Sequence, residues 1–210
     1  MTADARVLRL YAPTLAQRCR AIEWLLLDVD GVLTEGSIIY GTGAVELKHF
    51  HVRDGAGLKL WRQCGKRAAI VSGRTSAVVE VRAAELGLAP VLQGRWHKGP
   101  ALERLLAEEG LRPEQVAYLG DDLPDLAILG RCGLAAAVAD ATPALFRVAH
   151  YVTRAPGGRG AVRELIELIL RCQGRWQRVL DDLAGETAAA AGSFHGDGSN
   201  GFAQGQGEMT

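Results

Sequence analysis

Residues 24–34 read Trp24-Leu25-Leu26-Leu27-Asp28-Val29-Asp30-Gly31-Val32-Leu33-Thr34. The apolar run at the start of this stretch predicts a buried parallel strand, which ends in two carboxylates and a glycine. Because side chains alternate along a strand, we expect Asp28 and Asp30 to point to one side and Val29 to the other. Ligands of open α/β sheets bind beyond the carboxyl ends of the strands, where this pair falls.

Two carboxylates that lie close together repel each other unless a cation or a shared proton offsets the charge. Mg²⁺ would do so, because it binds through one or two carboxylates together with a substrate phosphate. Taken alone, the motif is more simply a polar turn after a core strand. The rest of the chain decides between these interpretations.

The composition predicts one soluble domain. The 210 residues are 48% hydrophobic, and Lys plus Arg equals Asp plus Glu at 24 each. Such a chain can bury one sizeable core, and its balanced charge indicates neither a nucleic-acid partner nor a membrane partner. No apolar run reaches the ~20 residues that span a bilayer, and the charged first twenty residues contain no signal-peptide core. The four cysteines form no C-x-x-C or zinc pattern, so free thiols and a cytoplasmic location are expected; they are Cys19, Cys64, Cys132 and Cys172.

Strands that alternate with helices predict an α/β fold, a Rossmann-like, doubly wound parallel sheet covered on both faces. The expected strands are residues 24–27, 67–71, 90–92, 116–119, 134–138 and 151–153. One exception interrupts the alternation: two β-prone runs around a glycine-rich turn predict a projecting β-hairpin near residues 37–50. This hairpin follows the carboxylate pair directly and could overhang it. No separate cap domain fits between Asp30 and Ser72.

Three regions are expected along the chain. Residues 1–20 form an N-terminal extension with a short helix near Leu15 to Ile22, residues 21–184 form the domain, and residues 185–210 form a disordered Gly/Ala-rich tail. The tail contains Gly196-Asp197-Gly198-Ser199-Asn200-Gly201, which matches the dinucleotide-binding pattern G-x-G-x-x-G. Because no strand precedes the match and no helix follows it, we treat it as a chance match.

Four polar clusters fall at strand ends or helix starts and together supply what phosphoryl transfer needs. The clusters are Asp28/Asp30, Ser72, Lys98 and Asp121/Asp122/Asp125. Asp28 is the expected nucleophile and Asp30 the expected acid and base, which would protonate the leaving alcohol and later deprotonate water. Ser72 is expected to begin a helix and to cradle phosphate with its hydroxyl and the neighbouring amides.

The remaining residues are expected to organise charge. Lys98 would bring a cation against the phosphoryl oxygens and Asp28, and Asp121 would complete the Mg²⁺ shell. Asp122 and Asp125 would hold that shell or Lys98 in place. Singly, Ser72 is an ordinary helix cap, Lys98 a surface lysine and the acidic run a surface turn. Their order and placement together favour the catalytic interpretation.

This arrangement resembles the haloacid dehalogenase superfamily of phosphohydrolases. Its four signatures correspond to Asp28-Val-Asp30-Gly31-Val32, Ser72-Gly73-Arg74, Lys98 and Gly120-Asp121-Asp122-Leu-Pro-Asp125. The resemblance implies that Asp28, the backbone carbonyl of Asp30 and Asp121 hold Mg²⁺. It also places Gly31 and Gly73 beside the substrate.

Within the superfamily, residues 22–174 resemble the capless phosphatases of 3-deoxy-D-manno-octulosonate 8-phosphate, which serve lipopolysaccharide sugar biosynthesis. The resemblance is carried by Val52-Arg53-Asp54-Gly55, Val138-Ala139-Asp140-Ala141 and, most tellingly, Gly157-Gly158-Arg159-Gly160-Ala161-Val162-Arg163-Glu164. It implies a homotetramer in which the 37–50 hairpins meet at the centre and a neighbouring subunit helps to close each site. Ser72 stands where the family more often has threonine, and the tail has no counterpart.

Four arginines are candidates for binding the carboxylate of a phosphorylated sugar acid, because a planar guanidinium binds carboxylates in bidentate fashion. They are Arg53, Arg74, Arg82 and Arg159, and we favour Arg74 and Arg82. Relatives that act on nine-carbon, sialic-type acids tend to carry glutamate at Arg74 and lysine at Glu85. The resemblance therefore favours the eight-carbon acid, with the nine-carbon acid as the alternative.

Two other classes of protein remain as alternatives. A signalling receiver domain also uses an acceptor aspartate, paired acids, Ser/Thr and Lys, but its acidic pair comes first in the chain and its acceptor later. A non-catalytic assembly protein would keep the fold and the tetramer. The filled catalytic positions argue against it.

Overall fold

The computed structural model of the chain describes residues 13–193. Six parallel strands form the central sheet, in the order β5-β4-β1-β6-β7-β8. They are β1 (Trp24–Leu27), β4 (Arg67–Val71), β5 (Val91–Leu92), β6 (Val116–Gly120), β7 (Leu134–Ala137) and β8 (Tyr151–Val152). This sheet confirms the predicted fold class.

Strand β1 lies in the middle of the sheet, with Leu26 opposite Ala69 of β4 on one side and opposite Tyr118 of β6 on the other. From β1 the chain first builds outward through β4 to β5. It then crosses over and builds outward in the other direction through β6, β7 and β8. The order of the strands therefore reverses at β1 and β6, which is where an open α/β sheet binds its ligands.

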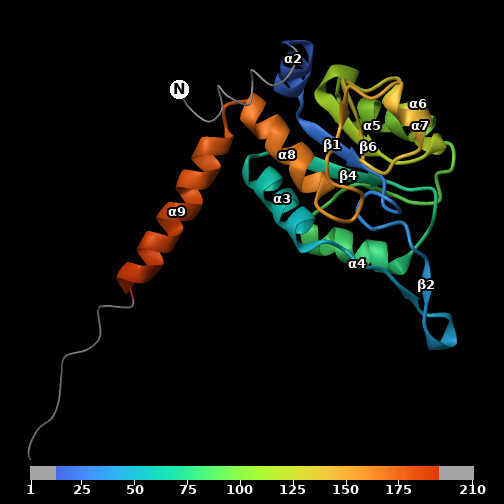
Figure 1. Cartoon of the computed structure of the whole chain (residues 1–210), viewed down its shortest axis with the longest axis horizontal. Coiled ribbons are helices and arrows are strands. Elements are labelled where there is room, and N and C mark those ends of the chain that lie inside the picture. The colour runs from blue at the N-terminus through green and yellow to red at the C-terminus, as the bar shows by residue number, and fades with distance from the viewer. Residues whose placement is uncertain (1–12, 194–210) are drawn as a thin grey trace, which may run out of the picture. The chain divides into compact units, whose positions relative to one another are not determined.

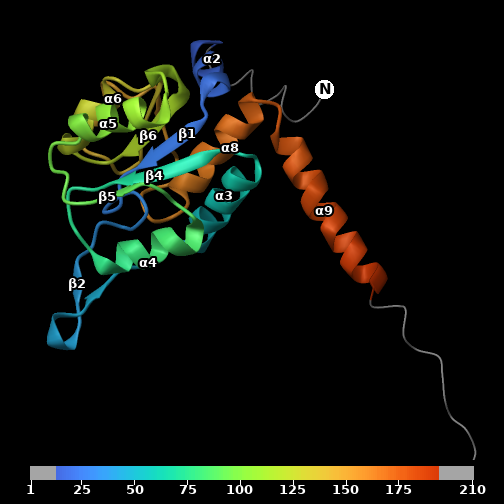
Figure 2. The same ribbon diagram turned by 180° about the vertical axis from the view of Figure 1, so that it is seen from behind.

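Helices cover both faces of the sheet. Figures 1 and 2 show α3, α4 and α8 on one face and α5 and α6 on the other. The α-helices between Pro13 and Cys172 are α2 (Pro13–Ala21), α3 (Val52–Gln63), α4 (Ala77–Leu86), α5 (Gly99–Glu109), α6 (Leu126–Leu129), α7 (Pro143–Phe146) and α8 (Ala161–Cys172). Three 3₁₀ turns lie in the same part of the chain, η1 (Thr42–Ala44), η2 (Pro113–Gln115) and η3 (Leu123–Asp125). Because both faces are covered, β1 and β6 are buried along their whole length and read as near-continuous apolar runs.

The predicted hairpin is present and projects away from the sheet (Figure 1). Its strands β2 (Ile39–Tyr40) and β3 (Glu46–Leu47) are antiparallel, with Ile39 opposite Leu47. The turn is closed where the backbone N–H of Gly41 donates to the carbonyl oxygen of Val45 at 2.8 Å. The hairpin and α3 occupy the chain between Asp30 and β4, which is consistent with a capless architecture.

The chain divides into a unit that ends at Trp176 and a second unit from residue 177 onward. The second unit contains most of helix α9 (Trp176–Ser193), which the sequence analysis did not predict. The helix crosses the predicted boundary at Gly185. Residues 1–12 and 194–210, including the match at 196–201, lie outside the described residues, so the disorder predicted there stays a prediction. Within residues 13–193, no helix is both long and apolar enough to cross a membrane.

Candidate active site

The polar clusters predicted from the sequence gather at one edge of the sheet. Asp28 directly follows β1, Ser72 follows β4, and Asp121 follows β6. These three strands are neighbours in the order β4-β1-β6, and the carboxyl ends of parallel strands meet at one edge. Lys98 is the residue directly before α5, and its ammonium lies at this edge as well, 2.7 Å from Asp28.

Lys98 lies in a buried charge cluster with two carboxylates. Its Nζ lies 2.7 Å from Oδ2 of Asp28 and 2.6 Å from Oδ1 of Asp125, and it donates to the hydroxyl of Tyr118 at 3.2 Å. The Tyr118 hydroxyl in turn donates to Oδ1 of Asp125 at 2.5 Å. Lys98 is 2% exposed and Asp125 is completely buried. A buried ammonium is tolerated only when it is paired and hydrogen-bonded in this way.

Burial shifts the acid–base properties of this cluster. It raises the pKa of Asp28 to about 6, with Lys98 acting in the opposite direction and Asp125 adding to the rise. Burial would lower the pKa of Lys98, but Asp28 and Asp125 outweigh it and raise that pKa. Asp28 is therefore mainly ionised at neutral pH, as a nucleophile must be. The ammonium that faces it stays charged.

Asp121 lacks an ammonium partner of its own. Burial, together with the charges of Asp28 and Asp125, raises its pKa to about 8, and Lys98 opposes this rise only in part. Its Oδ1 is buried and has no hydrogen-bond partner within residues 13–193. Oxygens of Asp28, Asp121 and Asp125 lie within 4.8 Å of one another. An orphaned carboxylate oxygen among other carboxylates is the donor set that Mg²⁺ prefers, so these residues fit the metal.

Asp125 has little capacity left to bind a metal. Its Oδ1 accepts from Lys98 and Tyr118, and its Oδ2 accepts from the backbone N–H groups of Asp121 and Asp122 at 2.8 and 3.2 Å. Asp125 therefore contacts both Lys98 and the acidic loop, which is consistent with the predicted role of holding them in place. Asp28 and Asp121 are the members of this group with more capacity to bind a metal, and their role as ligands stays a prediction. The roles assigned to the Asp30 carbonyl and to the exposed Asp122 stay predictions.

Gly31 lets the two acidic segments approach each other. Its φ of +92° is a conformation that residues with a side chain rarely adopt. A Cβ built on Gly31 would lie 2.1 Å from Oδ2 of Asp121. Only glycine therefore allows the loop after β1 to pass so close to the Asp121 carboxylate.

The loop after β1, rather than strand alternation, sets the positions of Asp28 and Asp30. Strand β1 ends at Leu27, and the backbone then turns so that the N–H groups of Val32, Leu33 and Thr34 all approach the carbonyl oxygen of Val29. Asp28 contacts Lys98, whereas the Asp30 carboxylate pairs with Lys48 of the hairpin. Because the strand ends at Leu27, strand alternation does not extend to Asp30, and the expectation that the two carboxylates point to one side stays a prediction.

Ser72 does not begin a helix, contrary to the prediction. Helix α4 begins at Ala77 with Ser76 as its N-cap, and a loop separates it from β4. Ser72 is 2% exposed, and its hydroxyl accepts a hydrogen bond from the backbone N–H of Arg74 at 3.3 Å. Any phosphate binding by Ser72 therefore rests on its hydroxyl and on the amides of this loop, without a helix dipole.

The candidate arginines lie in different surroundings. Arg74 is close to the loop after β1, residues 28–34, which is named the catalytic loop below: its guanidinium lies 3.6 Å from Oδ2 of Asp30 and 3.0 Å from Glu46. Arg82 pairs with Glu85 at 2.9 Å on α4. Arg53 and Arg159 line a pocket at the start of α8, and Arg159 also lies 3.2 Å from Glu35. Only Arg74 is seen next to a catalytic candidate.

The segment Gly157–Gly160, singled out above as a family signature, packs directly on the catalytic loop. A Cβ on Gly157 would lie 1.7 Å from the carbonyl oxygen of Gly31. The backbone N–H of Gly158 donates to Val32 at 2.9 Å, and that of Gly157 to the Asp140 carboxylate at 2.8 Å. The signature therefore supports the loop that carries Asp28 and Asp30.

A second layer of carboxylates holds this support in place. Asp54 accepts from the backbone N–H groups of Gly160 and Arg163 at 3.1 and 2.8 Å, at the N-terminus of α8. Glu164 accepts from the backbone N–H groups of Arg154 and Ala155 at 2.9 and 3.0 Å. The segments Arg53–Gly55 and Gly157–Gly160 are thus held together by the hydrogen bonds of Asp54, which gives a structural reason for both to be present in one chain.

Sequence reasoning did not assign a role to Tyr118 or to Lys48. Tyr118 lies in the buried strand β6, and a signal for it existed: a tyrosine in a fully apolar strand needs a partner for its hydroxyl. Lys48 lies in a short β-prone run without any local signal. Its contact with Asp30 depends on how the hairpin folds back.

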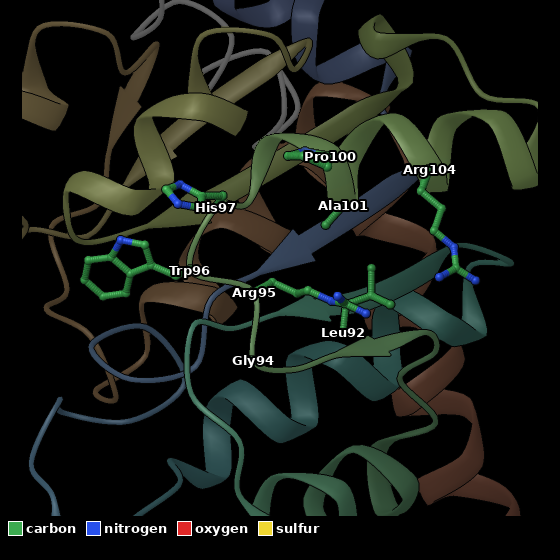
Figure 3. A pocket seen from close by; sticks show the side chains of 8 residues that line it. All are labelled: Leu92, Gly94, Arg95, Trp96, His97, Pro100, Ala101 and Arg104. Atoms are coloured by element: carbon green, nitrogen blue, oxygen red, sulfur yellow. The ribbon is translucent and has the colours of Figure 1, made fainter.

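A pocket lies beside the loop that leads into α5. Arg95, Trp96, His97 and Arg104 are among its lining residues (Figure 3). Figure 3 shows the side chains of Trp96 and His97 on one side and that of Arg95 directed towards Leu92. None of the catalytic candidates lines this pocket, so it has no part in the chemistry described above. Trp96 is 67% exposed and lies beside Gly73.

The fold and the acidic site define a hydrolase of a known class. The family of haloacid dehalogenase-like hydrolases matches residues 59–165, and the chain belongs to this family. The chain is 43% identical, over 188 residues, to the 3-deoxy-D-manno-octulosonate 8-phosphate phosphatase of Escherichia coli strain K12. The matched region covers 88% of this chain and 98% of that protein.

Two solved structures of such phosphatases are similar to this one. The Yersinia pestis enzyme matches with a TM-score of 0.77 and 46% identity, over 79% of this chain and 90% of that chain. The Moraxella catarrhalis enzyme, solved in complex with a magnesium ion, a phosphate ion and KDO, matches with a TM-score of 0.79 and 39% identity. That match covers 80% of this chain and 97% of the other.

Proposed function

We propose that the chain is a Mg²⁺-dependent phosphatase that hydrolyses 3-deoxy-D-manno-octulosonate 8-phosphate to the free sugar acid and phosphate. The observation that carries the proposal is the placement of Asp28 between the Lys98 ammonium and the orphaned carboxylate of Asp121. The names of the Escherichia coli and Yersinia pestis relatives support the substrate, as do the ligands of the Moraxella structure. The reaction would serve lipopolysaccharide sugar biosynthesis.

The first step transfers the phosphoryl group to the protein. A carboxylate oxygen of Asp28 attacks phosphorus, the bond from phosphorus to the ester oxygen breaks, and Asp30 donates a proton to that oxygen. Lys98, 2.7 Å from Asp28, offsets the negative charge of the group in transfer. When bound at Asp28 and Asp121, Mg²⁺ would neutralise and orient the phosphate.

The second step releases phosphate. Asp30 accepts a proton from water, the water oxygen attacks phosphorus, and the bond from phosphorus to Asp28 breaks. Asp125 and Tyr118 keep Lys98 in place through both steps, because both bind its ammonium, at 2.6 and 3.2 Å. Ser72 and the amides near Gly31 and Gly73 are the proposed phosphate contacts.

The sugar acid needs a cation for its carboxylate, and Arg74 is the proposed one. Its side chain is 38% exposed and lies beside Asp30, at the same edge of the sheet as the phosphate site. A substrate carboxylate would have to displace the Glu46 contact of Arg74. Arg82 is proposed to contribute across a subunit boundary, and Arg53 and Arg159 remain candidates for the same carboxylate. A nine-carbon sugar acid 9-phosphate is the alternative substrate.

We also propose that the protein acts as a homotetramer assembled through the hairpins. Large apolar side chains of the hairpin face solvent, which favours a protein partner for this surface; they are Ile38, Tyr40, Val45 and Leu47, each about half exposed or more. None of the four cysteines forms a disulfide within residues 13–193, which supports a reducing, cytoplasmic compartment. Sedimentation of the Tyr40→Ser/Leu47→Asp variant tests the assembly: a species smaller than the parent supports it, and an unchanged mass contradicts it.

The function is tested with a panel of phosphorylated eight- and nine-carbon sugar acids and 4-nitrophenyl phosphate, with and without Mg²⁺. We expect turnover only with Mg²⁺ and the highest kcat/KM on the eight-carbon acid. Asp28→Asn should abolish turnover, whereas the exposed control Asp182→Asn should not alter it. Turnover by Asp28→Asn near the parent level contradicts the assignment. A stable phosphoprotein without turnover would instead indicate a signalling domain.

A further inference from the structure

The hairpin contributes a buried lysine to the acid–base residue. Lys48 follows β3, and its side chain is only 1% exposed although the hairpin itself projects into solvent. Its ammonium is paired with Oδ1 of Asp30 and lies 3.3 Å from Glu46. An ammonium this deeply buried must be held by its partners, because it has lost its hydration.

The two oxygens of Asp30 have different surroundings. Oδ1 accepts a hydrogen bond from Lys48. Oδ2 lies 3.6 Å from Nε of Arg74, which is beyond hydrogen-bond distance, and has no other partner in the part of the chain that the structure describes. One oxygen is therefore fixed and the other is left available to exchange a proton.

The same four charges join three separate segments. Lys48 and Glu46 come from the hairpin, Asp30 from the loop after β1, and Arg74 from the loop after β4. Glu46 lies 3.0 Å from Arg74 and 3.3 Å from Lys48, so each anion is close to both cations. Within residues 13–193, the ion pairs of the Asp30 carboxylate are those with Lys48 and Arg74, and catalytic groups lose rate steeply when they are misplaced by about 1 Å.

We propose that Lys48 is a positioning residue: it holds Oδ1 of Asp30 so that Oδ2 faces the leaving oxygen, and the hairpin is thereby part of the acid–base apparatus. This inference rests on the proposed phosphatase function. Lys48 itself touches no reacting atom. It acts through the carboxylate that it orients.

The test uses the dependence of the rate on the leaving group, which a merely structural lysine would not alter. An alkyl leaving group needs its proton from Asp30 during phosphoryl transfer, whereas 4-nitrophenolate leaves without one. kcat/KM reports this first transfer. We therefore expect Lys48→Met to lower kcat/KM at least about tenfold more for the sugar-acid phosphate than for 4-nitrophenyl phosphate.

Three further variants complete the experiment. Lys48→Arg keeps the cation. It should therefore bring the ratio of kcat/KM on the sugar-acid phosphate to kcat/KM on 4-nitrophenyl phosphate most of the way back to that of the parent. Lys59→Met, at an exposed lysine of α3, should match the parent on both substrates. If Lys48→Met does not fold, Lys48→Gln serves in its place, since it keeps a hydrogen-bond donor without the charge.

Equal losses on the two substrates would overturn the proposal, as would a Lys48→Arg variant no better than Lys48→Met. Failure of the parent protein on both substrates is a different result. It would remove the proposed function itself rather than the role of Lys48.

Discussion

Replacing Gly157 by alanine should slow catalysis from a position that carries no chemical group. The new Cβ would lie 1.7 Å from the Gly31 carbonyl oxygen, and Cβ atoms essentially never come closer than 3.0 Å to such an atom. The gap must therefore open by about 1.3 Å, at a contact between backbone segments that cannot swing aside. Gly31 belongs to the loop between Asp28 and the hairpin, so the displacement reaches Asp28 and Asp30, the proposed nucleophile and acid.

The size of the effect follows from these contacts. Overpacking of this kind costs about 1–3 kcal/mol, or about 2–10 °C in Tm for a domain of this size. A misplacement of about 1 Å lowers catalytic rates by roughly 10²-fold. Gly130→Ala is the control, because φ there is −71° and the new Cβ would meet only the Leu126 carbonyl oxygen at 3.4 Å.

The assay is Mg²⁺-dependent hydrolysis of 4-nitrophenyl phosphate, followed alongside a thermal melt. We expect Gly157→Ala to lose about 10²-fold in kcat/KM and Gly130→Ala to stay within about threefold of the parent. A Gly157→Ala variant with the rate and Tm of the parent would refute the claim that this segment supports the catalytic loop.

The charge cluster leads to four further expectations. Lys98→Met leaves Asp28 and Asp125 buried without their cation, so it should lower the free energy of unfolding by about 3–5 kcal/mol in urea denaturation. The control Lys59→Met, at an exposed lysine, should change it by no more than about 0.5 kcal/mol. Equal effects of the two variants would contradict the pairing of Lys98 with these carboxylates. Tyr118→Phe removes one hydrogen bond to a carboxylate and should cost about 1–3 kcal/mol, and an unchanged denaturation midpoint would contradict its role. The pKa of Asp121, raised to about 8, predicts that Mg²⁺ binding at pH 7 releases a proton, so that the calorimetric heat depends on the buffer. Between about pH 4 and 8, Asp121 holds a proton in the folded chain that it does not hold in the unfolded chain, so the metal-free protein should lose stability as pH rises through that window. Mg²⁺ should offset this loss. An effect of Mg²⁺ on stability that does not depend on pH would contradict the expectation.

The sheet and most of the site could be predicted because their signals are local. The apolar run before Asp28 and the acidic run after β6 each mark a strand end within a few residues. Parallel pairing then brings these ends together without any further information. The roles of Lys98 and Asp125 followed from the same reasoning, and their 2.6 Å contact confirms the pairing.

What could not be predicted depends on details of the backbone or on distant contacts. The start of α4 at Ala77 rather than Ser72 reflects a loop whose residues carry no helix-start signal that distinguishes Ser72 from Ser76. The pairing of Lys48 with Asp30 depends on the path of the chain as it leaves the hairpin after β3, which no local pattern reports. The fit of Gly157 against Gly31 joins residues that are far apart in the sequence, and periodicity cannot report such a contact.

The most direct measurement is mass spectrometry of the protein quenched in acid during turnover of 4-nitrophenyl phosphate with Mg²⁺. The account predicts a phosphate adduct on the peptide that contains Asp28, present with Mg²⁺, absent without it and absent in Asp28→Asn. Turnover without any adduct on that peptide, or an adduct that persists in Asp28→Asn, would contradict the proposed role of Asp28 as nucleophile.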